Sequence, residues 1–385
     1  MRDTVRAKTS RALKWLARLA KRCLLAGMSI LLAAGAAEIG LRLAGYRRPR
    51  IVGDEVAREM TMAPNAEFVY RGYLPGSFSD VENKVRLNSS GFHDVEHQPG
   101  RAATNTFRLL VVGDSYVAAL SVPLEQTFFR RLERRLREED PLRRGSYEVI
   151  AMGRGNQAQQ KERMYVKRAV PVYRPDAVLV VFFCGNDIME NCPETFSQAR
   201  NFALVYQSQV APRKIAMFHR LLWMPGSRLN GLFAEAAAAW YARRLDWFVP
   251  GLSSGDLVSP ELGVYAQPLD PLWSRAYACT DAQLKKMHKT ASALDTPLWI
   301  ASLAGPQVLG EARANVDWSR PGSWIAGWCA SNGVPHCDLN PAIAAAGVRR
   351  AFWPHDGHLN PAGNAAVVDP LFKFVAAHAG KLSGE

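Results

Sequence analysis

Residues 107–115 read Phe-Arg-Leu-Leu-Val-Val-Gly-Asp-Ser, and this stretch decides the fold class. The run Phe107–Val112 is apolar apart from Arg108 and is short, which is typical of a buried strand. The turn Gly113-Asp114-Ser115 follows directly, and the next residues carry an amphipathic helical pattern to about residue 139. A buried strand that leads straight into a helix indicates a parallel sheet.

The same alternation of strand and helix repeats along the chain. Further strands are predicted at residues 147–151, 177–183, 297–302 and 334–338, with helical stretches between them and a closing helix at 362–377. Buried apolar strands that alternate with helices predict an α/β fold in which helices cover both faces of a parallel sheet. Residues 190–275 are rich in proline and break this rhythm, so we expect an insertion there, with a helical Ala-rich stretch at about 230–246.

The composition is that of a globular protein with an unusual N-terminus. The chain has 385 residues, 48% of them hydrophobic and 22% charged, which excludes a mostly disordered or coiled-coil protein. The net charge is +13, but residues 1–50 alone hold twelve Lys and Arg against two acids. The globular part is therefore nearly neutral, and it has too little charge for the basic face that nucleic-acid binding requires.

The N-terminal region contains a candidate membrane anchor. Residues 23–37 carry no charge, and extending the run past Glu38 and Arg42 to residue 44 gives about 22 residues, or roughly 33 Å of helix. Eight basic residues precede the run, so we expect residues 1–22 in the cytoplasm, residues 23–45 as a transmembrane anchor and the rest outside. Three alternatives stay open: a cleaved signal peptide ending at Ala34-Gly35-Ala36, a helix lying on the membrane surface, and a buried core helix.

Residues 46–105 are rich in Pro, Gly and Asn, with short apolar pieces. This composition predicts an extended linker that becomes ordered near residues 85–88. The remainder, residues 106–380, is then expected to form the main domain around the insertion.

The six cysteines do not form the dense pattern of a disulfide scaffold. Cys184 and Cys192 are close in sequence, as are Cys329 and Cys337. A location outside the cytoplasm would permit disulfides, and free buried cysteines are equally compatible with the pattern.

Four short stretches lie at the ends of predicted elements, where open α/β sheets place their sites. Ser115 stands at a sharp strand-to-helix turn, Gly153 ends the second strand, and Asn186 comes just after the third. His358 precedes the closing helix, with Asp356 two residues before it. A serine hydroxyl, an exposed backbone N–H, an amide donor and a histidine beside a carboxylate are the parts of nucleophilic acyl transfer. Each residue alone also has an ordinary interpretation, as a helix cap, a turn or a loop residue.

The order Ser, Gly, Asn, His at these positions resembles the SGNH (GDSL-type) hydrolase family over roughly residues 106–380. More narrowly, the chain resembles bacterial members with an N-terminal membrane anchor. The shared features are Glu38-Ile39-Gly40-Leu41-Arg42 at the end of the apolar run and Asn88-Ser89-Ser90-Gly91-Phe92-His93-Asp94-Val95-Glu96 before the first strand. The resemblance implies a three-layer, flavodoxin-like parallel sheet with an N-terminal transmembrane helix and an inserted helical and loop region.

The resemblance also implies a role for each residue. Ser115 would be the nucleophile, His358 the base, and Asp356 the group that orients His358. The N–H groups of Ser115 and Gly153 and the side chain of Asn186 would form the oxyanion hole. Acyl transfer through an acyl-serine needs neither metal nor cofactor.

Two positions depart from the family pattern. Met152 follows a position where the family often has Asn, and His355 stands three residues before His358, where the family has its carboxylate. Asp356 is the nearest acid, and the alternatives are orientation by a backbone carbonyl or an inactive site.

These implications define three functional hypotheses. The first is a membrane-anchored esterase that removes acyl groups, chiefly O-acetyl, from a cell-envelope glycan or a lipid-linked glycan on the outer side of the bacterial cytoplasmic membrane. The second is an O-acyltransferase of an exopolysaccharide or envelope glycan, with a multi-span acyl-donor protein as partner, and the third is an inactive glycan-binding scaffold. Four tryptophans of the insertion are candidates either for a sugar-stacking platform or for core packing. They are Trp223, Trp240, Trp247 and Trp273.

Overall fold

The computed structural model describes residues 2–46, 50–51, 62–72, 78–79, 81–100, 105–197, 227–233, 236, 260–306, 315–354 and 356–383. The chain divides into a smaller unit, Met1–Pro49 with Arg213–Arg244, and a larger unit, Arg50–Pro212 with Leu245–Glu385.

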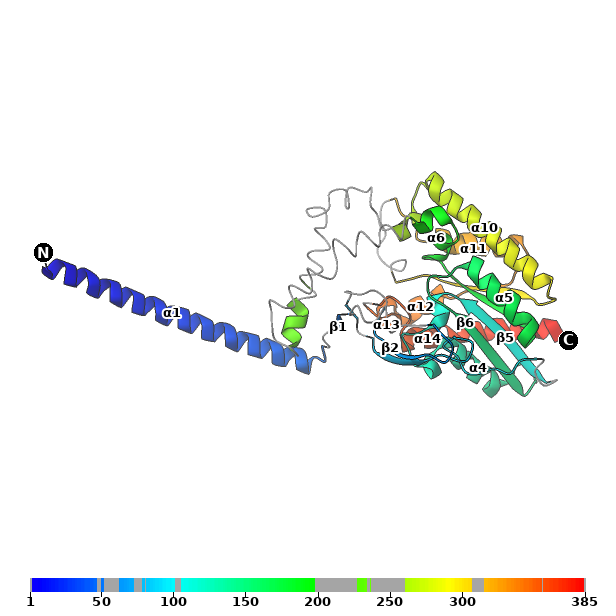
Figure 1. Ribbon diagram of the computed structural model, residues 1–385, viewed down its shortest axis with the longest axis horizontal. Helices are drawn as coiled ribbons and strands as arrows, with labels where there is room; N and C mark the ends of the chain where they lie inside the picture. The colour runs from blue at the N-terminus through cyan, green and yellow to red at the C-terminus, as the bar shows by residue number, and fades with distance from the viewer. Residues whose placement is uncertain are drawn as a thin grey trace. The chain divides into compact units, whose positions relative to one another are not determined.

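A five-stranded parallel sheet forms the centre of the larger unit (Figure 1). In spatial order its strands are β6 (Ser146–Gly153), β5 (Thr106–Gly113), β7 (Ala177–Phe183), β8 (Leu298–Leu303) and β9 (His336–Asp338). This is the strand order of flavodoxin-like folds, in which the chain reverses direction across the sheet between the first and third strands. The five predicted strands and the predicted parallel α/β fold are confirmed.

Helices cover both faces of the sheet, so the unit has three layers. The helices α4 (Phe128–Glu139) and α15 (Val368–Ala379) pack on one face. The helices α5 (Gln159–Tyr173), α10 (Pro271–Ser292) and α11 (Arg320–Ser331) pack on the other. Side chains alternate along a strand, so Leu109 and Val111 of β5 belong to the first core and Leu110 and Val112 to the second.

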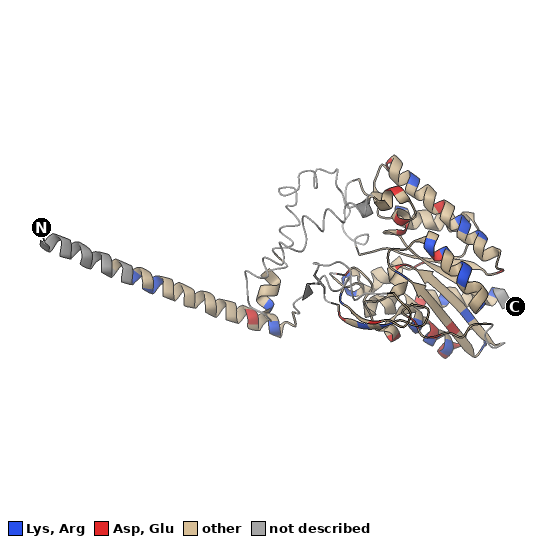
Figure 2. Ribbon diagram, in the orientation of Figure 1, with Lys and Arg blue, Asp and Glu red and all other residues tan. Residues whose placement is uncertain are grey.

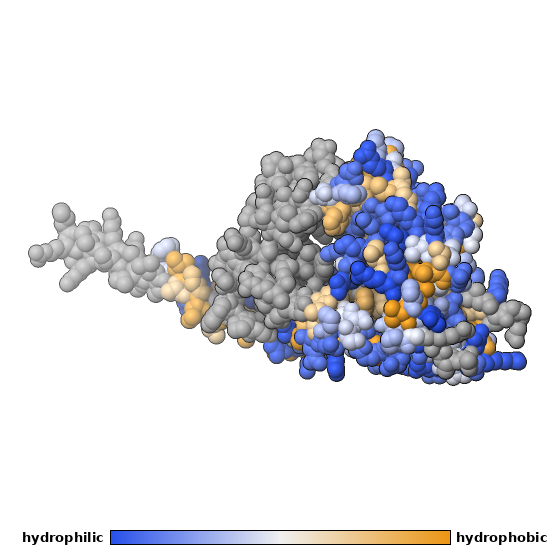
Figure 3. All heavy atoms as spheres, turned by 45° about the vertical axis from the view of Figure 1, so that its right-hand side comes forward, coloured by the Kyte–Doolittle hydropathy of each residue, from blue (hydrophilic) through white to orange (hydrophobic). Residues whose placement is uncertain are grey.

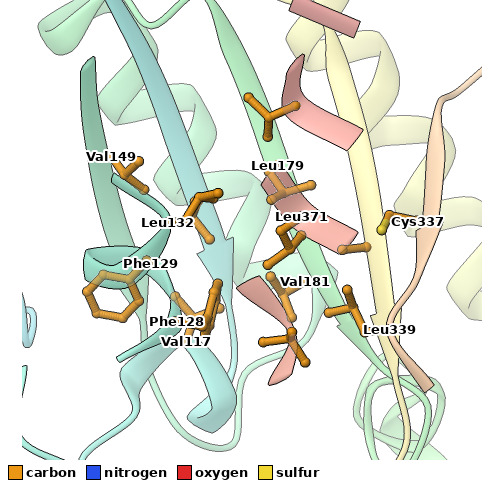
Figure 4. Close-up of a cluster of buried hydrophobic side chains, with 14 of the residues drawn as sticks. Val117, Phe128, Phe129, Leu132, Val149, Leu179, Val181, Cys337, Leu339 and Leu371 are labelled. Atoms are coloured by element: carbon orange, nitrogen blue, oxygen red, sulfur yellow. The ribbon is translucent and has the colours of Figure 1, made fainter. Parts of the chain in front are cut away.

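Figure 4 shows part of the first core, where Leu132 of α4 and Leu371 of α15 lie over Val149 and Leu179 of the sheet. These side chains are fully buried. Each contributes roughly 1.5–3 kcal/mol relative to an exposed position, so this packing fixes the strand ends on which the site is built.

Arg108, which interrupts the first apolar strand, is itself buried. Its guanidinium lies 2.7 Å from Glu148 Oε2 on β6 and donates to Gly100 O at 2.7 Å and to Tyr173 O at the end of α5. A buried charge is tolerated when it is paired in this way, so the arginine joins the start of the sheet to α5.

The segment before the sheet contains strands at lower residue numbers than the sequence predicts. Strands β2 (Glu67–Tyr70) and β4 (Asn83–Arg86) form an antiparallel pair with a small core of their own, which includes Phe68, Tyr70, Val85 and Leu87. The two-residue strands β1 (Arg50–Ile51) and β3 (Phe78–Ser79) also pair. The structure therefore contains strands before residues 85–88, within the region that the sequence predicts to be an extended linker.

The motif at residues 88–96 fastens this segment to the main sheet. Asn88 Oδ1 accepts hydrogen bonds from the N–H groups of Ser90 and Phe92, and Glu96 accepts from Ser89. Buried Asp94 accepts the N–H of Ala151 on β6 at 2.7 Å. The motif therefore has a structural role, because it joins the segment before the sheet to strand β6.

The remaining described elements are short. They are α3 (Ser115–Ala118), η1 (Leu124–Gln126), α6 (Asp187–Glu190), η3 (Pro260–Tyr265), α12 (Asn340–Ala346), α13 (Val348–Ala351), α14 (Pro361–Ala366) and η4 (Gly380–Ser383). The predicted closing helix is divided into α14 and α15, with a turn at Val367.

The inserted region is described only at its two ends and at residues 227–233 and 236, so most of the predicted helix at 230–246 lies outside the described residues. Trp273 is buried in the second core, which supports packing rather than sugar stacking for this residue. The other three tryptophans of the predicted platform lie outside the described residues.

The cysteines of the described residues are free thiols. Cys184, Cys192, Cys329 and Cys337 are buried. No disulfide joins Cys184 to Cys192 or Cys329 to Cys337. The thiol of Cys192 instead donates a hydrogen bond to Glu194 Oε2 at 3.1 Å.

The smaller unit is built on one long helix, α1 (Arg2–Leu43). Its stretch Arg18–Leu43 is long and apolar enough to cross a membrane, and none of the apolar window within it is buried. Figure 2 shows a long part of this helix without charged residues, and Figure 3 shows described atoms there in the colour of hydrophobic residues. This exposure contradicts the alternative of a buried core helix. The helix is continuous through residues 22 and 23, and the predicted boundary there between cytoplasmic segment and membrane span stays a prediction.

Glu38 and Arg42, which interrupt the apolar run, have partners within the same unit. Glu38 lies 2.9 Å from Arg42 and accepts hydrogen bonds from Ser227 Oγ and from the N–H groups of Arg228 and Leu229. Arg228 in turn donates to the carbonyls of Leu41 and Arg42. The end of α1 and the start of the helical stretch at 228–233 therefore cap each other.

Candidate active site

Ser115 is the first residue of α3 and stands directly beyond the end of β5. Asp114 caps this short helix, accepting the N–H of Tyr116 at 2.8 Å. The helix lies very close to the strand ends. A Cβ at Gly113 would meet Val117 Cγ2 at 2.4 Å, and one at Gly153 would meet Ala118 N at 2.1 Å. These two glycines are register partners on β5 and β6, and together they make room for the turn that presents the serine.

His358 and Asp356 form a hydrogen-bonded pair. His358 Nδ1 lies 2.6 Å from Asp356 Oδ1. The second carboxylate oxygen, Oδ2, accepts a hydrogen bond from Tyr70 OH of β2 at 2.8 Å. The His358 ring also packs against Tyr116, with ring centroids 5.2 Å apart, and Tyr116 OH donates to Gly357 O. The pairing leaves Nε2 of His358 available to a reacting group, the arrangement required of a general base.

Asp356 and His358 each shift the pKa of the other toward the charged form. Burial by itself would lower the pKa of His358, but the charge of Asp356 and its hydrogen bond outweigh burial, so this pKa is raised. Burial would likewise raise the pKa of Asp356, but the charge of His358 and the hydrogen bonds from His358 and Tyr70 outweigh it, so this pKa is lowered. Asp356 is therefore held as an anion beside His358, an arrangement suited to stabilising a positive charge on the imidazole.

Ser115 and His358 open into one pocket with about 590 Å³ of empty space, its open mouth included. Its lining comes from four places. They are the segment before the sheet (residues 62–100, here called the lead-in segment), α3 and the loop after it, the loop after β6, and His358. The lining residues are Met62, Tyr70, Ser115, Ala118, Leu120, Ser121, Arg154, Gly155, Asn156 and His358. The pocket thus brings together the predicted nucleophile and the predicted base.

The predicted oxyanion residues Gly153 and Asn186 do not line this pocket. Gly153 is buried beneath α3, while Gly155, two residues further on, reaches the pocket wall. Asn186 stands at the start of α6 and donates to Glu190 Oε1 at 2.9 Å. Gly155 is the glycine of this loop that lines the pocket, and the oxyanion roles given to Ser115, Gly153 and Asn186 stay predictions.

Behind Ser115 lies a group of buried acids. Burial raises the pKa of Asp114 to about 6, against the N–H groups of α3 and the attraction of His358. Burial also raises the pKa values of Glu162 and Asp187 well above the ordinary range, and Gln159 donates to both side chains. Asp187 also accepts the N–H of Phe183 at 2.9 Å, so the group holds the end of β7 in place. In the part of the chain that the structure describes, no three or more His, Cys, Asp or Glu are grouped to hold a metal ion.

Sequence reasoning missed the contribution of the lead-in segment. Met62 and Tyr70 line the pocket, although their region has the composition of a linker. No periodicity or motif marks Tyr70, because its contact with Asp356 joins residues 286 positions apart. His355, at the usual carboxylate position, lies outside the described residues.

No protein-family model matches the chain, and no curated protein matches it either. Among solved structures, it is similar to a putative lipolytic protein of the G-D-S-L family from Desulfitobacterium hafniense DCB-2, with 10% identity and a TM-score of 0.38 over 69% of this chain and 98% of that one. It is also similar to the acetyl xylan esterase AlAXEase, with 12% identity and a TM-score of 0.39 over 70% of this chain and 100% of that one. A third is the lipase/acylhydrolase from Enterococcus faecalis, with 9% identity and a TM-score of 0.38 over 71% and 96% of the two chains. By name the first of these is a G-D-S-L protein, the second an acetyl xylan esterase and the third a lipase/acylhydrolase. At such low identity the names leave the activity of this chain to be inferred from its own site.

Proposed function

We propose that this protein is a serine ester hydrolase in which Ser115, His358 and Asp356 act together. The observation that carries the proposal is the 2.6 Å contact between His358 Nδ1 and Asp356 Oδ1 beside a pocket that Ser115 also lines. A base whose far nitrogen is fixed by a buried carboxylate, opening on the same pocket as a serine at a helix start, is suited to acyl transfer.

In the proposed reaction, Ser115 Oγ attacks the acyl carbonyl carbon while His358 Nε2 takes the hydroxyl proton. The N–H group of Ser115, at the start of α3, stabilises the oxyanion. The tetrahedral intermediate then breaks its bond to the alcohol oxygen, which leaves with the proton from His358. Water, deprotonated by the same imidazole, hydrolyses the acyl-serine and restores the hydroxyl. The apolar side chains of Met62, Ala118 and Leu120 can receive the acyl methyl group.

The test is hydrolysis of 4-nitrophenyl acetate by the full chain in detergent. Ser115→Ala should abolish release of nitrophenol and leave the melting temperature almost unchanged, because Ser115 is half-buried and no described core contact depends on its hydroxyl. Equal rates in the wild type and the variant would remove Ser115 as nucleophile.

We further propose that the natural substrate is an acylated glycan or lipid-linked glycan on the outer side of the cytoplasmic membrane, to which α1 anchors the enzyme. The supporting observations are the exposed apolar stretch Arg18–Leu43 and the basic residues before it. A fusion of alkaline phosphatase at residue 60 should be active outside the cytoplasm. A fusion active only as a cytoplasmic reporter would contradict this topology.

A further inference from the structure

Arg154 is a cation in the wall of the pocket, alongside Ser115 and His358. It follows the last residue of β6, and its N–H donates to Gly113 O at 3.3 Å, which ties its backbone to the turn before the nucleophile. Its side chain is half-buried, and Nη2 donates to Met62 O at 2.8 Å. The guanidinium is therefore held at a defined place beside the reacting residues.

Within the described residues, Arg154 has no carboxylate partner. The described lining of the pocket contains no Asp or Glu. Nε of Arg154 is buried and finds no hydrogen-bond acceptor among the described residues. A guanidinium offers five N–H donors, and the one side-chain hydrogen bond to Met62 uses only one of them.

Buried arginines elsewhere in the described chain face carboxylates, as Arg130 does with Glu133 at 3.0 Å, although the Nε of Arg130 also lacks an acceptor. Arg108 is buried with Glu148 at 2.7 Å and with two backbone carbonyls as acceptors. A buried donor without an acceptor costs free energy, more so on a charged group. Arg154 lies beside the proposed nucleophile Ser115 without a carboxylate partner among the described residues, so an anionic group of the substrate could pair with it.

We propose that Arg154 binds a carboxylate or phosphate group of the ester substrate, so that the preferred substrate is an acylated acidic sugar. The proposal rests on the proposed function and narrows its substrate class. Arginine suits this role because its planar fork forms paired hydrogen bonds with either anion.

The experiment compares acetate release by the full chain in detergent from three matched esters. They are mono-O-acetylated methyl glucoside, the corresponding methyl glucuronide, and the corresponding glucose 6-phosphate. Wild-type kcat/KM should favour at least one acidic ester over the neutral one by roughly tenfold or more, and the preferred ester tells carboxylate from phosphate. Arg154→Gln should reduce this ratio by roughly 10–100-fold, the value of a lost charge-assisted hydrogen bond.

Arg168→Gln is the matched control, since Arg168 is an exposed arginine of α5 outside the pocket lining. It should leave the ratio of acidic to neutral kcat/KM unchanged. A wild type without acidic preference, or an Arg154→Gln variant that keeps the preference, would overturn the proposal while leaving the esterase function standing.

A second measurement separates failure of the anion site from failure of the esterase function. Calorimetric titration of Ser115→Ala with methyl glucuronide and with inorganic phosphate should show binding of at least one that is lost in Ser115→Ala/Arg154→Gln. Loss of binding on removing Arg154 supports the anion site even if the wild type hydrolyses none of the esters. Absence of binding, or binding that does not depend on Arg154, contradicts it.

Discussion

At the scale of single residues, the spacing of Asp356 and His358 has a backbone explanation. Gly357 between them has a φ of +79°, in the left-handed region that favours glycine. This tight turn brings the two side chains into contact although only one residue separates them. The turn is further held by Tyr116 OH, which donates to Gly357 O at 3.0 Å. The offset that looked irregular in the sequence is thus compatible with a well-formed pair.

Asp356→Asn should lower kcat by roughly 10²–10⁴, because the amide cannot stabilise the imidazolium and permits the wrong tautomer. The charge of Asp356 raises the pKa of His358, so its removal should shift the acidic limb of kcat/KM to lower pH. In the wild type this limb should lie above the ordinary histidine value of 6.5. Steady-state kinetics across pH check both effects.

The control for that variant is His355→Ala, at the position where the family usually has its acid. It should cost less than roughly tenfold in kcat. A crippled His355→Ala with a near-normal Asp356→Asn would reverse the assignment.

Tyr70→Phe should lower kcat by roughly 5–30-fold with KM nearly unchanged, because Asp356 loses the 2.8 Å hydrogen bond on Oδ2 and is less firmly held as an anion. Tyr277→Phe is the control. The Tyr277 hydroxyl donates to Val264 O in the second core, and neither residue lines the pocket. A merely structural role for Tyr70 would make the two variants alike in kcat and alike in melting temperature.

At the scale of elements, the site depends on how closely α3 lies over the ends of β5 and β6. Gly153→Ala places a methyl group 2.1 Å from Ala118 N, so α3 or the strand must move. We expect a loss of about 2–4 kcal/mol in the free energy of unfolding and a large loss of activity. Gly322→Ala in α11, where a Cβ meets nothing within 4 Å, should be neutral or slightly stabilising. Urea denaturation of both variants measures the difference, and equal stabilities would contradict the packing described.

The same elements show what sequence reasoning can reach. Strands β5 to β9 were predictable within a few residues, since continuous apolar runs between helical patterns have few other interpretations. The helices predicted between and after these strands in the main domain are present, although the last one divides at Val367, and most of the predicted helix at 230–246 lies outside the described residues. The pair β2 and β4 was not predictable, because its small core forms only through contacts such as that of Asn83 with Leu120 O.

The candidate site was predictable where local sequence fixes geometry. Ser115 after its strand and His358 with Asp356 are local patterns, and the structure brings the serine and histidine to one pocket. Tyr70 and Met62 reach the pocket through long-range packing, which no local pattern encodes. Arg154 was visible only as a loop residue, because its significance depends on which carboxylates are near it.

At the scale of the whole molecule, the capping between Glu38 and residues 227–229 joins helix α1 to the inserted region. Glu38→Ala should remove these hydrogen bonds and expose the peptide bond after Arg228. We expect trypsin to cleave there several-fold faster in the detergent-solubilised chain. Ser29→Ala, on the same helix with only its own backbone as partner, should cleave at the wild-type rate. Equal rates for the two variants would show that the cap does not hold this segment.

The central claim is that Ser115 is a nucleophile activated by His358. Labelling with a fluorophosphonate probe, followed by mass spectrometry of the modified peptide, tests this claim without knowledge of the natural substrate. The wild type should carry the phosphonyl group on Ser115, and His358→Ala should label at least roughly a hundredfold more slowly. An unlabelled wild type, a label on another residue, or a rate that does not depend on His358 would contradict the account.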